Sequence, residues 1–594
     1  MKKLLSGNEA IALGAYHAGV RVATAYPGTP STEILESVAR FPDVYAEWST
    51  NEKVAMEVAM GAAFAGARAM ASMKQVGLNV ASDPFMAASV TGISAGLVVV
   101  NADDPGIHSS QCEQDNRFYA GFAKVPMLEP ADSQEAYDVM AYAFDISEKF
   151  DTPVLVRMTT RISHAKSVVD IKGKRKAGGQ AAFRHDAKKF VMLPTNARVR
   201  CQVVEERVKN LADYVEGFPL NEIVPGERSL GIVSCGVAYQ YAREVFPKAS
   251  FLKLCTTWPL PSSLIRKFAA GVDRLLVIEE LSPYLEGHIR RMGIPVTGKR
   301  FIPELGELDP GIIEDAARQA GLLPKNLAVK PARVPENLPK RPPLLCPGCP
   351  HTGLYFVLST IGQRAKGKNP KLTIAGDIGC YTLGAYPPLS ALDTTACMGA
   401  SIGQAIGMDK AGIGEKAIAV IGDSTFMHSG ITGLVNAVYD KAKITLIILD
   451  NGTTAMTGHQ EHPGTGVTVQ GKQTQAVEIE SLVRGIGVKD VRVLDAFDLK
   501  ALRANVRSSL QSPELSVLIV RGQCAVQARR AEPRVVDAEK CNNCGTCLLT
   551  GCPAILGGEH TAIDAALCIG CSICQQVCPK QAIVPKSQFK AKAS

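Results

Sequence analysis

The sequence has few aromatic residues and no long apolar run. Phe, Trp and Tyr make up 6% of its 594 residues, whereas Gly, Ala, Val and Ile are plentiful. This composition favours layered α/β architecture over an all-β fold. Because no stretch approaches the roughly eighteen apolar residues that span a bilayer, we expect no interaction with a membrane.

The sequence also lacks a strong charge imbalance. Its net charge is +8, and its most visible basic stretch, residues 172–179, lies in a polar segment that we interpret as a solvated linker. Nucleic-acid binding would need a basic face with aromatic side chains, so we expect no nucleic-acid partner. Because Glu9 precedes any hydrophobic signal core, we expect no secretory leader and a cytoplasmic protein.

Cysteine, by contrast, is abundant. In a reducing compartment, the 17 cysteines of this chain indicate metal or redox chemistry rather than disulfides.

Four domains are expected from the order of apolar strands, helical stretches and prolines. Short apolar strands alternate with helical stretches, which is typical of parallel α/β sheets. Seven prolines between Pro331 and Pro350 exclude regular structure and indicate a boundary. We predict domains at residues 1–195, 196–335, 340–530 and 531–594.

The last of these domains contains an internal repeat with eight cysteines. Segments beginning at Asp537 and Asp564 align with an offset of 27 residues, and each carries four cysteines followed by proline. The second copy reads C-x2-C-x2-C-x3-C-P, and the first has one more residue before its last cysteine. A zinc ribbon, which uses two CxxC pairs, fits this pattern poorly, whereas iron–sulfur clusters fit it well.

This repeat resembles the bacterial two-cluster ferredoxins, in which three close thiolates hold one cluster and the fourth crosses to the other. The resemblance implies two 4Fe-4S clusters. It assigns one to Cys541, Cys544, Cys547 and Cys578, and the other to Cys552, Cys568, Cys571 and Cys574. The additional residue before Cys552 is a departure that can alter the geometry or the potential of that site.

Two polar residues end apolar strands on either side of one helical stretch. Asp423 follows the first strand and Asn451 follows the second. Because parallel strands end at the same edge of a sheet, these side chains can converge. Their oxygens suit a magnesium ion, which in turn can hold a diphosphate.

The segment from Gly422 to Asn451 resembles the thiamine diphosphate motif, commonly GDG followed later by NN, with Ser424 and Asp450 as departures. The resemblance implies thiamine diphosphate and Mg²⁺ as cofactors. It assigns the metal to Asp423, Asn451 and the Thr453 carbonyl, the diphosphate to a glycine-bearing helix start at Gly399, and an apolar support for the cofactor to Met456. Close helix packing and a core methionine are the alternatives at the last two positions.

The first domain contains a run from Asn51 that resembles pyrimidine-binding domains. By this resemblance Glu52 bonds the aminopyrimidine N1′ and promotes loss of the thiazolium proton, with Glu57 as the competing carboxylate. The stretch YPGTPSTEI, residues 26–34, resembles a signature of 2-oxoacid:ferredoxin oxidoreductases. It implies that Thr29 lies beside substrate and cofactor, whereas a plain Pro-Gly turn is the alternative.

Taken together, these motifs resemble the thiamine-diphosphate-dependent 2-oxoacid:ferredoxin oxidoreductases, and in domain order their large (alpha) subunits that act on indolepyruvate. The resemblance implies two doubly wound thiamine-diphosphate-binding domains, a transketolase-C-terminal-like α/β domain and a two-cluster ferredoxin domain. It also implies oxidative decarboxylation of an aryl pyruvate with CoA and ferredoxin, giving arylacetyl-CoA, and a smaller beta subunit as partner.

Several alternatives stay open. The substrate can be another 2-oxoacid, and the chain can be a non-oxidative thiamine-dependent decarboxylase or an electron-transfer subunit. A third cluster is suggested by four cysteines whose spacing matches that of a cluster in related thiamine subunits, namely Cys346, Cys349, Cys380 and Cys524. A zinc site or plain buried thiols are the alternatives.

Overall fold

The computed structural model describes residues 1–176, 181–324, 335, 337–338, 342–362 and 372–589. The chain divides into two compact units, Met1–Ala332 with Val469–Gly471 and Arg333–Thr468 with Lys472–Ser594. The proline-rich boundary between Pro331 and Pro350 and the basic stretch at 172–179 lie partly outside the described residues.

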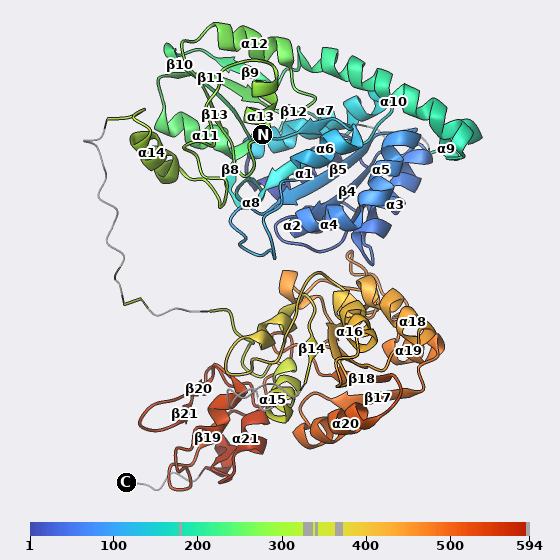
Figure 1. Ribbon diagram of the computed structural model, residues 1–594, viewed down its shortest axis with the longest axis vertical. Coiled ribbons are helices and arrows are strands. Elements are labelled where there is room, and N and C mark those ends of the chain that lie inside the picture. The colour runs from blue at the N-terminus through green and yellow to red at the C-terminus, as the bar shows by residue number, and fades with distance from the viewer. Residues whose placement is uncertain (177–180, 325–334, 336, 339–341, 363–371, 590–594) are drawn as a thin grey trace. The chain divides into compact units, whose positions relative to one another are not determined.

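The first sheet of the first unit consists mainly of parallel strands (Figure 1). Its order is β12-β6-β7-β5-β4-β2-β3, and β12 runs antiparallel to β6. Its strands are β2 (Val22–Ala25), β3 (Tyr45–Trp48), β4 (Ala69–Lys74), β5 (Leu97–Asp103), β6 (Met127–Leu128), β7 (Val154–Thr159) and β12 (Thr256–Trp258). Residues of the central strands are buried on both faces, as their apolar sequences predict.

Helices pack on both faces of this sheet. Val98 and Val100 of β5 share one apolar cluster with the helices α1, α2 and α7, and the alternate residues Leu97 and Val99 share another with α3, α4, α5 and α6. These helices are α1 (Gly7–His17), α2 (Thr32–Val38), α3 (Glu52–Phe64), α4 (Gln75–Val80), α5 (Ser82–Thr91), α6 (Arg117–Ala123) and α7 (Ser133–Phe150). After β7, the helix α8 (Thr160–His164) leads to β8 (Lys166–Asp170), which pairs with β1 (Lys2–Ser6).

The middle sheet of the same unit has the order β13-β10-β11-β9. Its strands are β9 (Glu222–Val224), β10 (Glu227–Cys235), β11 (Ala249–Leu254) and β13 (Leu275–Ile278). The helices that accompany it or lead to it are α9 (Ala187–Phe190), α10 (Pro194–Val215), α11 (Gly236–Val245), α12 (Ser262–Ala270), α13 (Tyr284–Arg291) and α14 (Pro310–Gln319). The strand β12, which follows β11, pairs with β6, so a segment beyond residue 195 completes the first sheet.

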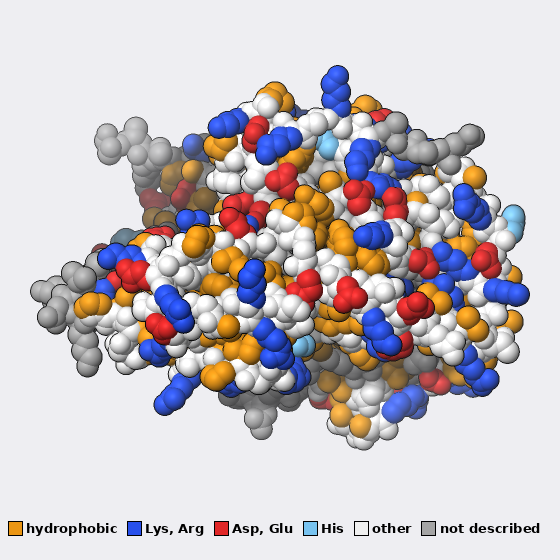
Figure 2. Space-filling view, turned by 90° about the horizontal axis from the view of Figure 1, so that it is seen from above, with side chains coloured by type: hydrophobic (Ala, Val, Ile, Leu, Met, Phe, Trp, Pro, Cys, Tyr) orange, Lys and Arg blue, Asp and Glu red, His pale blue; other side chains and the backbone are white. Residues whose placement is uncertain are grey.

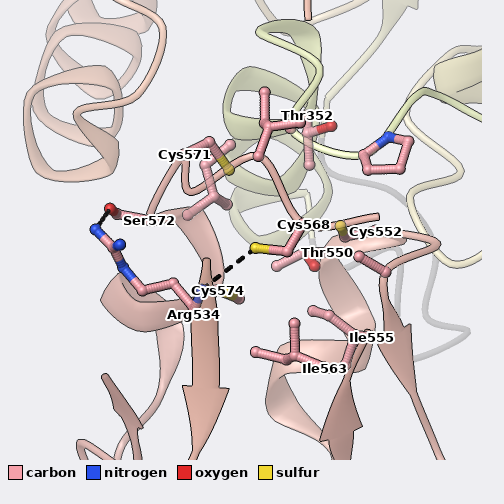
Figure 3. Close-up of a pocket in the computed structure, with 15 residues that line it drawn as sticks. Thr352, Arg534, Thr550, Cys552, Ile555, Ile563, Cys568, Cys571, Ser572 and Cys574 are labelled. Atoms are coloured by element: carbon pink, nitrogen blue, oxygen red, sulfur yellow. Dashed lines mark hydrogen bonds between the residues drawn. The ribbon is translucent and has the colours of Figure 1, made fainter. Parts of the chain in front are cut away.

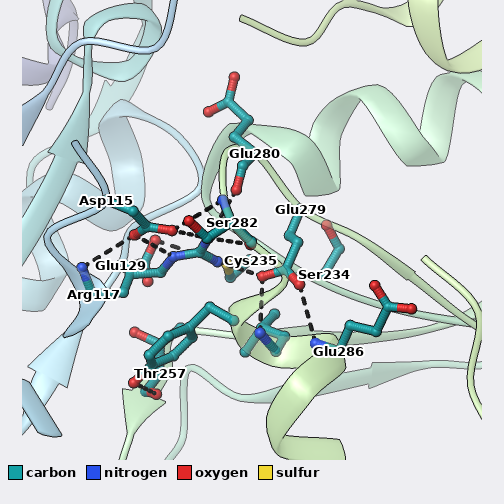
Figure 4. A network of polar contacts seen from close by, with 12 residues as sticks. Asp115, Arg117, Glu129, Ser234, Cys235, Thr257, Glu279, Glu280, Ser282 and Glu286 are labelled. Atoms are coloured by element: carbon teal, nitrogen blue, oxygen red, sulfur yellow. Dashed lines mark hydrogen bonds and ion pairs between the residues drawn. The ribbon is translucent and has the colours of Figure 1, made fainter. Parts of the chain in front are cut away.

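A buried polar network joins these two parts of the first unit (Figure 4). The guanidinium of Arg117 contacts the carboxylates of Asp115 at 2.6 Å and of Glu279 at 2.5 Å, and it donates to the carbonyls of Glu280 and Ser282. All of its charged partners are buried with it. Because buried charges are tolerated only when paired and hydrogen-bonded, this network fixes the middle sheet against the first.

The second unit contains the third sheet, which is parallel and has the order β14-β15-β16-β18-β17. Its strands are β14 (Ile374–Ala375), β15 (Ile418–Gly422), β16 (Thr445–Asp450), β17 (Asp490–Asp495) and β18 (Ser516–Arg521). Its α-helices are α15 (His351–Ile361), α16 (Ala400–Lys410), α17 (Asp423–Thr425), α18 (Ile431–Tyr439), α19 (Ile479–Ile486) and α20 (Leu499–Gln511). Two short 3-10 helices, η3 (Cys380–Ala385) and η5 (Ala455–Thr457), and a short π-helix, η4 (Phe426–Gly430), accompany them. Apolar clusters on its two faces hold alternate residues of the central strands.

The cysteine-rich segment forms short antiparallel pairs, β19 (Arg534–Val536) with β22 (Ile583–Pro585) and β20 (Ile555–Leu556) with β21 (Ala562–Ile563). The turn η6 (Thr546–Thr550), the helix α21 (Ile573–Val577) and the turn η7 (Lys586–Gln588) complete it. Its buried apolar cluster consists of Ile555 and Ile583 with Cys547 and Cys574. Such a small core contributes little stability, so bound clusters would supply much of the folding energy of this segment.

The molecular surface carries charges of both signs. On the face shown in Figure 2, lysine and arginine side chains are interspersed with aspartate and glutamate side chains. Within the described residues, every helix is too short or too polar to cross a lipid bilayer.

The Arg117 network leads to a prediction about stability. Replacing Arg117 with methionine leaves Glu279 buried without its cation and leaves Asp115 with Arg157 alone, at 3.8 Å. We therefore expect a loss of about 3–5 kcal/mol in the free energy of unfolding of this unit. Urea denaturation of the two proteins measures this loss. As a control, Arg228→Met removes an exposed ion pair with Asp273 and should cost no more than about 1 kcal/mol. Equal effects of the two substitutions would contradict the role given to the network.

A second prediction concerns pH. Burial raises the pKa of Glu280 to about 7, although the backbone N–H of Leu308 donates to its carboxylate. Because the folded protein holds this proton to a higher pH than the unfolded chain, Glu280 contributes stability at low pH that is lost as the pH rises toward 7. Relative to the parent, the stability of Glu280→Gln in urea titrations should therefore rise between pH 4.5 and about pH 7 and level off above that. The exposed control Glu304→Gln should follow the parent; parallel curves for all three proteins would refute this assignment.

Candidate functional site

The tips of β15 and β16 bring Asp423 and Asn451 together. Oδ2 of Asp423 accepts hydrogen bonds from the backbone N–H groups of Asn451 at 3.1 Å and Gly452 at 2.8 Å, and its Oδ1 accepts from the N–H of Ser424 at 2.8 Å. Asn451 in turn accepts at Oδ1 from the N–H of Thr453 at 3.1 Å. Backbone amides thus hold the carboxylate in place, and the side chains of Asp423, Asn451 and Thr453 are all buried.

Two histidines that the sequence analysis missed flank this pair. Nε2 of His462 lies 3.4 Å from Oδ2 of Asp423, and Nε2 of His351 lies 3.5 Å from Nδ2 of Asn451. Burial lowers the pKa of His351 to about 4, so this ring is neutral near pH 7. His351 lies in the stretch LLCPGCPHTG and His462 in the stretch TGHQEHPGTG. Both are far from Asp423 along the chain or separated from it by irregular spacing, so no local sequence pattern indicates that they lie beside it.

The hydrogen bonds of the two ring nitrogens of His462 indicate what kind of group the site can hold. Its Nδ1 accepts from the backbone N–H of Gly464 at 3.1 Å, so the proton of the neutral ring is assigned to Nε2. That buried Nε2 has no hydrogen-bond partner among the described residues. An unsatisfied buried donor beside hard oxygen ligands fits an anionic group accompanied by magnesium.

The start of α16 is organised by another residue that the sequence analysis missed. Gly399 has a φ of +85°, and a Cβ there would lie 2.4 Å from Cβ of Ser429. The N–H groups of Gly399 and Ser401 donate to the buried carboxylate of Asp377 at 2.8 and 3.0 Å. The helix N-terminus therefore already stabilises an anion, and this anion is the side chain of Asp377.

Met456 lies in η5, and its side chain is 49% exposed. It is not a core methionine, so the alternative considered from the sequence does not hold. An exposed apolar side chain two residues after the loop of Asn451 to Thr454 is available to contact a molecule bound there.

In the first unit, Glu52 and Thr29 lie at the ends of adjacent strands. Glu52 is the first residue of α3, which follows β3, and Thr29 lies in the loop after β2. Glu52 is buried and packs against Gly77, where a Cβ would lie 2.6 Å from the carboxylate. The competing Glu57 is exposed and pairs with Lys53 on the outer surface of the helix, which favours Glu52.

Cysteines of both repeats line a cavity in the C-terminal segment (Figure 3). Cys568, Cys571 and Cys574 of the second repeat meet Cys552 of the first repeat there. Another cavity is lined by Cys541, Cys544, Cys547 and Cys578. These are the two crossed sets that the ferredoxin resemblance implies. In the described residues, no group of three or more His, Cys, Asp or Glu side chains is placed to hold a single metal ion.

Backbone N–H groups point at several of these sulfur atoms. The N–H of Arg534 donates to Sγ of Cys568 at 3.4 Å, and that of Ala582 donates to Sγ of Cys578 at 3.3 Å. The N–H of Gly348 bonds the sulfur of Cys552, which favours its thiolate, although burial raises the pKa of this thiol. Hydrogen bonds to sulfur are among the features that set cluster potentials.

The additional residue before Cys552 has a structural explanation. Gly551 adopts a φ of +68°, and a Cβ there would lie 3.2 Å from Cδ of Pro388. The longer spacing thus forms a left-handed turn against the third-sheet domain, while Cys552 still reaches the cavity with its three partners.

The cysteines of the suggested third cluster also lie near one another. Burial, and then the neighbouring Cys346 and Cys524, raise the pKa of the Cys380 thiol to about 11. The pKa of Cys349 is raised in the same way, by burial and then by Cys346, Cys380 and Cys524. Such thiols stay protonated until a metal displaces the proton.

Comparisons with known proteins match three segments of the chain to family models. Residues 377–520 match the family model described as thiamine pyrophosphate enzyme, C-terminal TPP binding domain. Residues 13–209 match pyruvate flavodoxin/ferredoxin oxidoreductase, thiamine diP-bdg, and residues 561–584 match the 4Fe-4S binding domain.

Curated relatives match the chain nearly end to end. The indolepyruvate oxidoreductase subunit IorA of Archaeoglobus fulgidus is 41% identical over 98% of this chain and 97% of its own length. Those of Methanothermobacter thermautotrophicus and Thermococcus kodakarensis are each 40% identical, over 99% and 98% of this chain and 98% and 97% of their own lengths. The chain therefore belongs to the indolepyruvate oxidoreductase subunit IorA family, the alpha subunits of the thiamine-diphosphate-dependent indolepyruvate:ferredoxin oxidoreductases.

Proposed function

We propose that this chain catalyses the oxidative decarboxylation of indolepyruvate or a related aryl pyruvate, forming arylacetyl-CoA and passing the electrons through iron–sulfur clusters to ferredoxin. The observation that carries the proposal is the match over 98% of the chain to an indolepyruvate oxidoreductase subunit. The closeness of Asp423 to Asn451 and the two cavities lined by four cysteines each, all within the second unit, support the proposal.

We assign the diphosphate end of the cofactor to the tips of β15 and β16. Asp423, Asn451 and the Thr453 carbonyl would hold Mg²⁺, and the unsatisfied Nε2–H of His462 would donate to a phosphate oxygen. When bound, thiamine diphosphate supplies the electron-accepting ring that decarboxylation of a 2-oxoacid needs.

We assign the proton chemistry to Glu52. Its carboxylate is buried at the start of α3, where exclusion of water strengthens its interaction with a ring nitrogen. Glu52 would hold a proton at N1′ of the aminopyrimidine, and Thr29, on the neighbouring loop, would contact the substrate. Gly77 allows the close approach to Glu52, because a side chain there would clash with its carboxylate.

We further propose an order for the electron carriers. Cys346 and Cys349 flank Gly348, whose N–H bonds Cys552 and whose backbone lines the cavity of the second cysteine set. A third cluster on Cys346, Cys349, Cys380 and Cys524 would thus be separated from that cavity by one hydrogen-bonded turn. Cys544 is exposed, which makes the set Cys541, Cys544, Cys547 and Cys578 the exit toward ferredoxin.

The proposal requires partners. We expect a smaller beta subunit, oxidised ferredoxin, CoA and the aryl 2-oxoacid, in the cytoplasm. The test is methyl viologen reduction by this chain co-expressed with its smaller subunit, using indolepyruvate, phenylpyruvate and 2-oxoglutarate with and without CoA. CoA-dependent reduction that prefers the aryl substrates supports the proposal; no reduction with any of them would overturn it.

Cofactor binding gives a prediction for Asp423. Thiamine diphosphate with Mg²⁺ at about 100 times its dissociation constant should stabilise the parent by about 2.7 kcal/mol. Asp423→Ala removes a charged metal ligand, so the variant should show almost none of this stabilisation in thermal-shift measurements. Asp440→Ala, an exposed aspartate at the end of α18, is the control and should respond as the parent does. An unchanged response of Asp423→Ala would exclude the assignment.

The cysteine cavities give a prediction about metal content. Cys571→Ala removes one of the thiolates from the set around Cys552, so anaerobically reconstituted protein should lose about four iron atoms per chain. Iron analysis and electron paramagnetic resonance of the reduced protein measure the loss. The exposed Cys201 provides the control variant Cys201→Ala, which should keep its iron. Unchanged iron in Cys571→Ala, or stoichiometric zinc in the parent, would refute this cluster assignment.

A further inference from the structure

A buried lysine lies at the same sheet edge as the candidate catalytic residues of the first unit. Lys74 is the last residue of β4, its neighbour in the sheet is β2, and the loop after β2 carries Thr29. A Cβ on Gly28 would lie 2.9 Å from Cβ of Lys74, and the hydroxyl of Ser109, which contacts Lys74, donates to the carbonyl of Thr29 at 3.3 Å. Lys74 thus belongs to the sheet edge that carries Thr29 and Glu52.

The ammonium of Lys74 is buried without an ion pair. Its residue is 8% exposed, and in the described part of the chain no carboxylate lies within 4.0 Å of Nζ. Nζ donates to the carbonyl of Ser109 at 2.6 Å and contacts the Ser109 hydroxyl at 3.4 Å. A buried charge with only neutral partners is costly, and burial accordingly lowers the pKa of Lys74.

The nearby carboxylate of Asp104 is engaged elsewhere. It accepts hydrogen bonds from the N–H of Ser109 at 2.9 Å, from the hydroxyl of Ser110 at 2.6 Å and from the hydroxyl of Thr160 at 2.8 Å. Asp104 therefore holds the loop that covers Lys74 rather than neutralising it directly. Ser109 itself is exposed, so its carbonyl can be exchanged for a stronger acceptor at modest cost.

We propose that Lys74 binds the carboxylate of the 2-oxoacid substrate. This inference rests on the proposed function. Every 2-oxoacid carries a carboxylate next to its keto carbon, and the keto carbon must lie at the edge that holds Thr29 and Glu52. An ammonium can donate three hydrogen bonds. Among the described residues, Ser109 alone accepts hydrogen bonds from Nζ of Lys74. An anion there would pair the charge.

The chemistry of the step defines how Lys74 should affect the kinetics. The substrate carboxylate leaves as neutral carbon dioxide, so its attraction to Lys74 weakens as the bond to the keto carbon breaks. The interaction is therefore stronger in the bound substrate than in the transition state. Its removal should raise KM without a matching loss of kcat.

The experiment compares two non-reacting probes in the holoenzyme co-expressed with its smaller subunit. Indole-3-lactate carries the carboxylate and indole-3-ethanol lacks it. The ratio of their inhibition constants therefore reports the contribution of the carboxylate. Lys74→Met should reduce this preference for indole-3-lactate by about 10- to 100-fold, the range expected for a hydrogen bond to a charged group. Lys74→Arg, which keeps the charge, should retain most of it.

The outcomes separate this inference from the proposed function. If Lys74 only anchors the loop of Ser109, Lys74→Met would weaken both probes equally and leave the ratio unchanged, which overturns the inference alone. If the parent does not oxidise indolepyruvate, the proposed function falls and the inference with it. Thermal melting of Lys74→Met and Lys74→Arg verifies that both variants fold. If the methionine variant does not fold, Lys74→Gln, which has a polar but uncharged side chain, repeats the test.

Discussion

Parallel strands all end at one edge of their sheet, and that constraint positions the candidate functional residues of this chain. In the third sheet, the tips of β15 and β16 place Asp423 beside Asn451. In the first sheet, the ends of β4, β2 and β3 place Lys74, Thr29 and Glu52 in neighbouring positions. Loops at this edge can differ without cost to the sheet, because the apolar strands are stabilised by helices on both faces.

Buried charge is used in two different ways. Arg117 and Arg157 are each paired with buried carboxylates, and the pair of Arg117 with Glu279 joins the middle sheet to the first. Lys74 instead has neutral oxygen partners. A paired buried charge stabilises a fixed arrangement. An unpaired buried charge gains favourable interaction energy only when a ligand of opposite charge binds beside it. This difference separates the structural part of the first unit from its candidate binding edge.

The C-terminal segment has a small core that includes two of its own cysteines. Its apolar cluster is small, and its strands are only two or three residues long. Contacts to the third-sheet domain at Gly348 and Gly551 hold the cavity of Cys552 in place. The departure in cysteine spacing is therefore explained by packing against Pro388, and the crossed grouping of the thiols is kept.

Residue spacing and apolar periodicity in the sequence determined the features that depend on residues close together along the chain. The repeat located the eight cysteines, and its resemblance to two-cluster ferredoxins implied the two crossed sets. A strand–helix–strand pattern predicted that Asp423 lies close to Asn451, because parallel strands of regular geometry end at the same edge of a sheet. The resemblance already selected Glu52 over Glu57, and the burial of Glu52 with the exposure of Glu57 favours the same choice. Asp377 at the start of α16, His351 and His462 beside Asp423 and Asn451, and the unpaired charge of Lys74 came from the tertiary structure alone. Their contacts join separate segments, and no local pattern of residues encodes which segments will pack together.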